Sequence, residues 1–368
     1  MTDRLKELSR AGVSIWLDDL SRDRLESGNL AELTRTHSVV GVTSNPSIFA
    51  KALSDGEAYT EQLRGLKAAG ETDPEDVITT LTTDDIRNAC DLFRPIYDAT
   101  AGFDGRVSLE VDPRLAHDLD ATVAQARALH ALVDRENLHI KIPATDAGLQ
   151  AITATIAAGI SVNVTLIFSV QRYEQVLDAY LSGLEQAQRD GVDLSKIHSV
   201  ASIFVSRNDV EVDKRLEAIG SDEALALRGR VGLAISWLSH EAYAKVTASE
   251  RWQALASAGA NVQRPLWAST GTKSKEYSDV LYVEELITQG VVNTMPEKTL
   301  EAFADHGEVR GDTVVGRYDE GRRVIEALRA VGVDLDDVNA TVEAEGVTKF
   351  IDPWVELIDT VQQQLDAV

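Results

Sequence analysis

The 368-residue chain is short of several things, and each shortage excludes a class of protein. It has one cysteine, Cys90, so neither a disulfide framework nor a cysteine metal site can form within one chain. Its 36 Lys and Arg residues do not balance its 60 Asp and Glu residues. The resulting net charge of −24 argues against nucleic acid and anionic membranes as partners.

Long apolar runs are also absent from the sequence. No uninterrupted apolar segment is long enough to cross a bilayer, and the charged residues 1–8 do not resemble a signal peptide. A soluble cytoplasmic protein is therefore expected. The sequence contains no Gly-x-Ser-x-Gly elbow, Walker loop or His-Glu-x-x-His, and its seven histidines lack metal-ligand spacing, so no metal site is expected.

What the sequence does contain is a regular alternation of short β-branched runs and longer amphipathic stretches, typical of βα units on a parallel sheet. Eight such runs predict a closed (β/α)8 TIM barrel in the α/β class. An open, doubly wound sheet is the alternative, although no glycine-rich dinucleotide fingerprint follows the first run. The predicted strands are residues 14–19, 39–45, 106–112, 138–145, 161–169, 198–206, 264–270 and 291–296.

Two segments exceed a minimal barrel. The connection after the second strand is long and contains helical patterns, notably at 83–100, and the tail has further helices at 319–331 and 353–367. We therefore expect one barrel domain over 1–368, with a helical insertion at about 50–104 and C-terminal helices at about 319–368. Other helices are predicted at 118–134, 169–189, 209–219, 221–249 and 278–289.

The most informative residue is a lysine inside an apolar strand. Leu138, Ile140 and Ile142 alternate with His139 and Lys141, so the apolar set faces the outer helices and Lys141 faces the barrel axis. Burial disfavours the charged ammonium, and a neutral amine can attack a carbonyl to form a Schiff base. Alone, such a lysine would more often reach solvent or pair with a carboxylate.

The same alternation turns other side chains inward, mostly near the C-terminal ends of the strands, where barrel enzymes build active sites. Asp18 and Glu110 are candidate acid/base groups, although either could merely neutralise the lysine. The amides and hydroxyls could bind substrate hydroxyls or a catalytic water, or simply satisfy one another. The inward set comprises Asp18, Thr43, Asn45, Glu110, Asn163, Thr165, Ser202, Phe204, Ser206 and Ser269.

A phosphate site is predicted at the ends of the sixth and seventh strands. Ser202, Arg207, Ser269 and Lys273 lie at or just beyond these ends, and barrels often bind phosphate on their late strands. Either cation alone would more often be a solvated surface charge.

Six motifs stand at or near the ends of the predicted strands. They are Trp-Leu-Asp-Asp (16–19), Gly-Val-Thr-Ser-Asn-Pro-Ser (41–47), Val-Ser-Leu-Glu-Val-Asp (107–112), Ile-Lys-Ile-Pro (140–143), Ser-Val-Asn-Val-Thr-Leu-Ile-Phe-Ser (161–169) and Ala-Ser-Thr-Gly-Thr-Lys (268–273). These motifs resemble, in order, those of the transaldolase family, and the resemblance runs across all eight strands, from about residue 14 to 296. The Trp-Ala-Ser-Thr-Gly-Thr-Lys form at 267–273 and the chain length are most similar to the longer bacterial branch found in actinobacteria.

The resemblance implies class I aldolase chemistry without a metal or organic cofactor. It assigns Lys141 as the Schiff-base lysine, Asp18 as the proton-transfer group, and Glu110 with Thr165 as holders of a catalytic water. Lys273 stands where other transaldolases place an arginine. The implied or inward substrate-binding residues are Thr43, Asn45, Asn163, Ser202, Phe204, Arg207, Ser269 and Lys273.

The implied reaction belongs to the non-oxidative pentose phosphate pathway. A dihydroxyacetone unit passes from sedoheptulose 7-phosphate to glyceraldehyde 3-phosphate, which gives erythrose 4-phosphate and fructose 6-phosphate. The expected partners are these sugar phosphates, with the chain a monomer or homodimer. One alternative is a fructose 6-phosphate aldolase. Such aldolases are shorter than this chain, and Phe204 of this chain has no hydroxyl to position a water that would release the three-carbon unit. The other alternative is a barrel that senses sugar phosphate without turnover.

Overall fold

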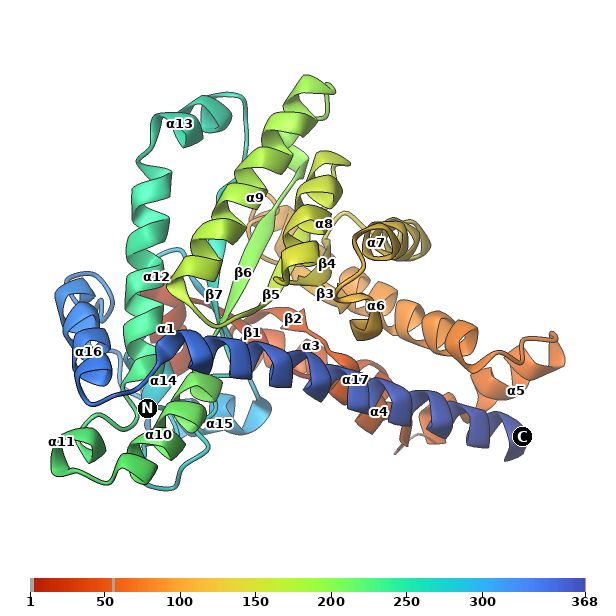
Figure 1. Cartoon of the computed structure of the whole chain (residues 1–368). Coiled ribbons are helices and arrows are strands. Elements are labelled where there is room, and N and C mark those ends of the chain that lie inside the picture. The colour runs from red at the N-terminus through yellow and green to blue at the C-terminus, as the bar shows by residue number, and fades with distance from the viewer. Residues whose placement is uncertain (1–2, 55–56, 368) are drawn as a thin grey trace.

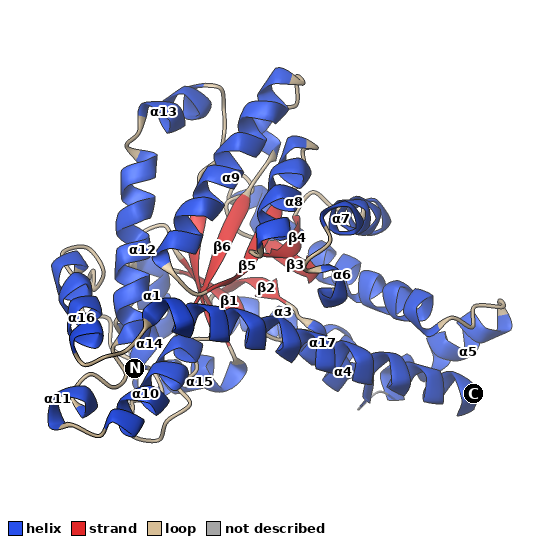
Figure 2. Cartoon of the chain, viewed as in Figure 1, coloured by secondary structure: helices blue, strands red, loops and turns tan. Residues whose placement is uncertain are grey.

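Eight parallel strands close into a barrel at the centre of the computed structural model, which describes residues 3–54 and 57–367 (Figures 1 and 2). They pair in sequence order, and β8 returns to β1, which confirms the predicted barrel and excludes the open sheet. The strands are β1 (Ser14–Leu17), β2 (Val39–Thr43), β3 (Arg106–Glu110), β4 (Leu138–Pro143), β5 (Val162–Ile167), β6 (Ser199–Phe204), β7 (Gln263–Ala268) and β8 (Val292–Met295).

Alternation along these strands separates the core from the barrel interior. Ile15, Val107 and Ile140 are fully buried and belong to the hydrophobic core. Within the barrel, the rings of Trp16 and His139 lie 6.1 Å apart, as expected for inward residues near the base. Lateral pairing aligns Glu110 with Lys141 and Lys141 with Asn163, so neighbouring strands present their polar residues at one level.

Helices surround the barrel (Figure 2). Those of the first half are α1 (Arg4–Arg10), α2 (Arg22–Glu26), α3 (Asn29–Thr36), α4 (Pro46–Ser54), α5 (Thr60–Ala68), α6 (Pro74–Ala99), α7 (Leu119–Val133) and α8 (Asp146–Ala157). Those of the second half are α9 (Val170–Arg189), α10 (Ser206–Ile219), α11 (Asp222–Leu225), α12 (Val231–Thr247), α13 (Glu250–Ser257), α14 (Leu281–Glu284), α15 (Glu297–His306), α16 (Tyr318–Ala330) and α17 (Leu335–Ala367). Single 3-10 turns are η1 (Glu57–Tyr59), η2 (Pro113–Leu115) and η3 (Leu194–Lys196).

The helix predicted at 278–289 is wrong, because only the turn α14 forms there. The carbonyls of Glu285 and Leu286 accept hydrogen bonds from the indole N–H groups of Trp237 and Trp267, at 3.2 and 3.0 Å. In a helix continuing to 289 and beyond, these two carbonyls would accept from the backbone N–H groups of residues 289 and 290, so the indole bonds take the place of that last helical turn. The helix predicted at 221–249 is likewise divided into α11 and α12, with Gly229 at φ +70° between them.

Two helices are longer than predicted. α6 begins at Pro74, where the Asp73 side chain accepts from the backbone N–H of Glu75 at 2.9 Å, a standard N-cap. α17 begins at Leu335 rather than 353 and continues through Pro353. Figure 1 shows α17 running across one end of the barrel, where it contacts α10, α4, α5 and α6. The insertion and the C-terminal extension therefore pack against each other.

None of the helices in the described ranges is both long enough and apolar enough to cross a membrane.

Candidate active site

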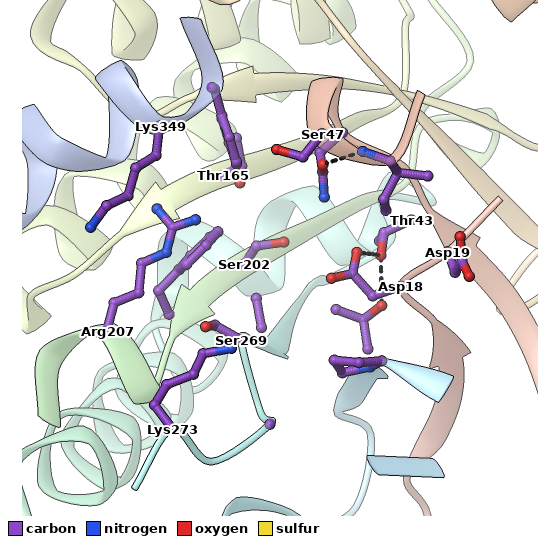
Figure 3. A pocket seen from close by; sticks show the side chains of 18 of the residues that line it. Asp18, Asp19, Thr43, Ser47, Thr165, Ser202, Arg207, Ser269, Lys273 and Lys349 are labelled. Atoms are coloured by element: carbon purple, nitrogen blue, oxygen red, sulfur yellow. Dashed lines mark hydrogen bonds between the residues drawn. The ribbon is translucent and has the colours of Figure 1, made fainter. Parts of the chain in front are cut away.

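A cavity of about 630 Å³ opens at the C-terminal ends of the strands, beneath α17. It gathers side chains from seven strands or the loops that follow them, which are far apart in sequence (Figure 3). Most of the predicted site lines it, namely Asp18, Thr43, Asn45, Lys141, Thr165, Ser202, Phe204, Arg207, Ser269 and Lys273. Glu110 and Asn163 do not line it.

Lys141 projects from β4 into this cavity and is only 4% exposed. Its Nζ donates to Glu110 Oε2 at 2.9 Å and to the Ser44 carbonyl at 3.1 Å. The ring of Phe350, from α17, lies with its centroid 5.3 Å from Nζ. The amine thus meets a carboxylate on one side and an apolar wall on another, so the lysine is both enclosed and ion-paired.

Glu110 lies at the end of β3, next to Lys141 and below the cavity surface. Burial raises the pKa of its carboxyl group, and the nearby Lys141 opposes that rise. Among the described residues, Glu110 Oε1 and Thr165 Oγ1 are buried without a hydrogen-bond partner. These residues come from β3 and β5, the strands on either side of Lys141. Buried polar atoms without a protein partner are commonly satisfied by water or ligand.

Asp18 follows β1 and faces the cavity, as the strand alternation predicts. It accepts a hydrogen bond from Thr43 Oγ1 at 2.7 Å, and Thr43 Oγ1 lies 2.6 Å from Thr294 Oγ1. Burial raises the pKa of Asp18, while Lys141 and Thr43 act in the opposite direction. Asp19 instead pairs with Arg24 at 2.8 Å. The two adjacent carboxylates therefore have different environments.

Of the two predicted asparagines, Asn45 lines the cavity and Asn163 lies beneath it. Asn163 is fully buried, where its Nδ2 donates to Ser108 Oγ at 3.0 Å and its Oδ1 accepts from Ser202 Oγ at 2.7 Å. It thus supports the floor of the cavity, and these polar groups satisfy one another. Asn45 lines the cavity, and its Oδ1 accepts from the Ile48 N–H at 3.1 Å at the start of α4.

The predicted phosphate residues gather on one side of the cavity. Figure 3 shows Arg207 and Lys273 opposite Asp18 and Thr43, with Ser269 near Lys273. The Arg207 guanidinium lies over the rings of Phe204 and Phe350, at 5.0 and 5.5 Å. Burial lowers the Arg207 pKa, and its Nη1 has no hydrogen-bond partner within the described ranges.

The loop after β7 positions Ser269 and Lys273. Ser269 Oγ lies 2.8 Å from Ser206 Oγ, at the start of α10, and its backbone adopts φ +57°. A left-handed conformation is uncommon for serine and turns the chain sharply at this point. Lys273 is exposed at the rim of the cavity.

Sequence reasoning missed the whole contribution of α17. Val342, Glu345, Lys349 and Phe350 form a wall of the cavity, and Lys349 Nζ pairs with Glu345 Oε2 at 2.6 Å. In Figure 3, Lys349 extends toward the side occupied by Arg207. Nothing in the sequence of an amphipathic helix indicates that it crosses a barrel mouth. Ser47, Lys51 and Thr294 were also missed.

No group of three or more His, Cys, Asp or Glu side chains in residues 3–54 and 57–367 is arranged to hold a metal ion.

Comparison with known proteins identifies relatives along nearly the whole chain. The family model described as "Transaldolase/Fructose-6-phosphate aldolase" matches residues 15–361. A protein named "Transaldolase" from Mycolicibacterium smegmatis is 62% identical over 363 residues, which cover 99% of this chain and 98% of the relative. Its counterpart from Thermobifida fusca is 61% identical over 367 residues, 100% of both chains. "Transaldolase 1" of Streptomyces coelicolor is 60% identical, covering 99% of this chain and 95% of the relative.

Proposed function

Because the chain belongs to the transaldolase/fructose-6-phosphate aldolase family and shares about 60% identity over its full length with proteins named transaldolase, it is a transaldolase, and we propose how its residues perform that reaction. The observation that carries the proposal is the position of Lys141. Its amine is nearly inaccessible to bulk water, yet it lines the cavity and touches a carboxylate.

In the proposed mechanism, the Lys141 ammonium gives a proton to Glu110, and the neutral amine attacks the ketone carbon of the donor sugar. The carbonyl oxygen takes up this proton and one from the attacking nitrogen, and it leaves as water, which gives a protonated imine. Asp18 then takes the proton of the hydroxyl on the fourth carbon. The bond between the third and fourth carbons breaks, its electrons pass to the iminium nitrogen, and an aldose leaves. The remaining enamine attacks the acceptor aldehyde, whose oxygen recovers the proton from Asp18, and water hydrolyses the new imine.

Glu110 and Thr165 are proposed to hold the water that forms and hydrolyses the imine. Both present a buried oxygen without a protein partner among the described residues, and they flank Lys141 from adjacent strands. In the resting site Glu110 also pairs with the ammonium, which keeps the buried charge compensated until substrate arrives. Thr43, Asn45 and Asn163 would bind or support the donor hydroxyls.

The substrate phosphate is proposed to bind opposite Asp18, on Arg207, Lys273 and Ser269, with Ser202 and Phe204 shaping that side. We add Lys349 to this group because it reaches the same cavity from α17. Its partner Glu345 also bears on Arg207 electrostatically. An incoming phosphate dianion would compete with the Glu345 carboxylate for Lys349.

The proposed donor is sedoheptulose 7-phosphate and the proposed acceptor is glyceraldehyde 3-phosphate, in the cytoplasm. The chain would act as one domain, because α17 packs on the barrel end and on the insertion together. A monomer or homodimer is the proposed state in solution.

Covalent trapping tests the assignment of Lys141. Borohydride reduction with fructose 6-phosphate should add one reduced three-carbon unit, and peptide mass mapping should place it on Lys141. The Lys141→Arg variant should show neither the adduct nor transfer. An adduct on another lysine would refute the assignment. Release of free dihydroxyacetone from fructose 6-phosphate, at the rate of transfer and without acceptor, would instead indicate an aldolase.

A further inference from the structure

A second polar cavity, of about 70 Å³, lies at the opposite end of the barrel from the active site. Its lining includes Phe103, Arg106, His139, His198, Asn261 and Arg264. Arg106 and Glu110 are the first and last residues of β3, and a strand rises about 3.3 Å per residue, so the two ends are roughly 13 Å apart. The mechanism above uses none of the residues lining this second cavity.

The charges around this cavity do not balance. Arg106 is 1% exposed, and the hydrogen bonds it makes within the described residues go to two neutral carbonyls, of Gly102 at 2.8 Å and Glu136 at 3.2 Å. Arg264 pairs with Asp104 at 3.1 Å. The two buried guanidinium groups therefore share one buried carboxylate, and uncompensated buried charge is costly.

The two histidines of the cavity cannot supply the missing negative charge. Burial and the neighbouring arginines lower the pKa of His198 to about 3 and hold that of His139 well below its usual range. Both imidazoles are therefore neutral near pH 7, where each can still donate one N–H. The cavity retains a net positive charge.

Hydrogen-bond donors converge on this space without enough acceptors. Arg106 Nη2 and both ring nitrogens of His139 have no partner in the described part of the chain. His198 Nε2 is not one of these free donors, because it lies 3.3 Å from the Asn261 side-chain N–H group and accepts from it. The rings of Tyr97 and Phe103 cover the guanidinium groups of Arg106 and Arg264, at 4.8 and 3.7 Å.

We propose that this cavity binds a small monovalent inorganic anion of the size of chloride. The anion would accept hydrogen bonds from Arg106 Nη2 and from the ring N–H of His139, which have no other partner in the described residues, and would offset the excess positive charge. Since a water molecule takes up about 30 Å³, the cavity has room for such an ion and one water but not for a sugar phosphate. Water alone could satisfy the free donors, but it would leave the charge uncompensated.

Thermal unfolding of the full chain in sodium chloride, bromide or gluconate, at one constant ionic strength, tests the proposal. Chloride and bromide should raise Tm saturably by roughly 2 °C relative to gluconate, because a ligand stabilises only the state that binds it. The Arg106→Gln variant should lose this difference. Arg94→Gln is the matched control, since Arg94 packs on the same Tyr97 ring at 5.4 Å but is exposed.

Bromide diffraction provides a measurement that does not depend on a variant that might not fold. Crystals of the wild-type chain soaked in bromide should show an anomalous peak in this cavity, beside Arg106 Nη2. Equal Tm values in chloride and gluconate, or water without bromide in this cavity, would overturn the proposal.

Discussion

At the scale of single residues, the two carboxylates near Lys141 differ in what they can reach. Asp18 lines the cavity and accepts from Thr43, whereas Glu110 lies below the surface and holds the ammonium. Burial raises the pKa of both, which brings them closer to the range where proton transfer at neutral pH is efficient. Only Asp18 can contact a substrate hydroxyl directly, so the two groups are suited to different steps.

Replacing Asp18 with Asn should therefore separate imine formation from bond cleavage. We expect kcat to fall by roughly 10²–10⁴-fold, the usual contribution of a general acid/base group. Borohydride trapping of intact donor on Lys141 should persist, because the amine is untouched. Steady-state kinetics and intact mass after reduction measure the two effects.

Asp19→Asn is the matched control for this prediction. Asp19 is the adjacent carboxylate, but it forms a salt bridge with Arg24 at 2.8 Å. We expect a small change in kcat. A severe loss of kcat in Asp19→Asn together with a mild loss in Asp18→Asn would show that Asp19, and not Asp18, transfers the proton.

Arg207 offers a second test at this scale. Its guanidinium faces the cavity with a free Nη1 in the described residues, so a phosphate would gain charge-assisted hydrogen bonds of about 1.5–3 kcal/mol each. Arg207→Ala should lower kcat/KM for fructose 6-phosphate by roughly 10-fold or more and leave that for fructose nearly unchanged. Equal losses on both donors would mean that Arg207 supports the fold or the chemistry instead.

At the scale of elements, α17 is what turns an open barrel end into an enclosed cavity. It brings Phe350 against Lys141 and Arg207, and it places Lys349 beside the phosphate side of the cavity. Excluding water from the Lys141 amine and from much of the Arg207 guanidinium strengthens the electrostatic interactions of these two groups. The helix therefore contributes both a wall and a charge.

Replacing Lys349 with Met should test that charge while keeping the length of the side chain. We expect KM for fructose 6-phosphate to rise roughly 3- to 10-fold with a smaller change in kcat, because an exposed cation contributes modestly to binding. Lys245→Met is the matched control, since Lys245 forms the same i,i+4 pair with Glu241 at 3.3 Å on α12. Identical KM values in both variants would remove Lys349 from the phosphate site.

The elements show where sequence reasoning succeeds and where it stops. Strand alternation placed Lys141, Asp18 and Thr43 correctly, because a period of two leaves only two faces. It could not reveal that Lys349 and Phe350 meet that site, since a contact between residues two hundred positions apart depends on where α17 docks. It also predicted a helix at 278–289, because local propensity does not report that two distant indoles take its carbonyls.

At the scale of the whole molecule, the fold was the most predictable feature. Eight β-branched runs separated by amphipathic stretches leave few ways to bury both faces of a parallel sheet, and the barrel closes in sequence order. The net charge of −24 was equally plain from composition. The distribution of the acidic residues between core and surface could not be predicted, because the burial of individual carboxylates depends on tertiary packing.

Asp209 illustrates the consequence for stability. It is fully buried near the start of α10, accepts from the Gly232 N–H at 2.8 Å and from the Tyr282 hydroxyl at 2.6 Å, and has a pKa raised by burial to about 7. Between about pH 4, the ordinary pKa of an aspartate, and about pH 7, the Asp209 carboxyl group is protonated in the folded chain but ionised in the unfolded chain. Its contribution to the free energy of unfolding is therefore present at low pH and is lost as pH rises through 7.

The Asp209→Asn variant, which keeps the shape but cannot ionise, should remove this dependence. Its Tm relative to wild type should rise by roughly 3 °C between pH 5 and pH 8, as measured by thermal unfolding. Asp222→Asn, at an exposed position on α11, should show no such trend. A difference that stays constant with pH would mean that Asp209 does not change its protonation over this range.

The packing of α17 against α4, α5 and α6 also bears on whether the chain could be shortened toward a smaller barrel. Val361 and Leu365 of α17 are buried, as are Leu53 of α4 and Leu63 of α5, so each addition covers apolar surface that the other would expose. Removing either one alone would leave an uncovered hydrophobic face, which favours aggregation. The insertion and the extension therefore form one structural unit, and a shortened barrel would have to lose both of them.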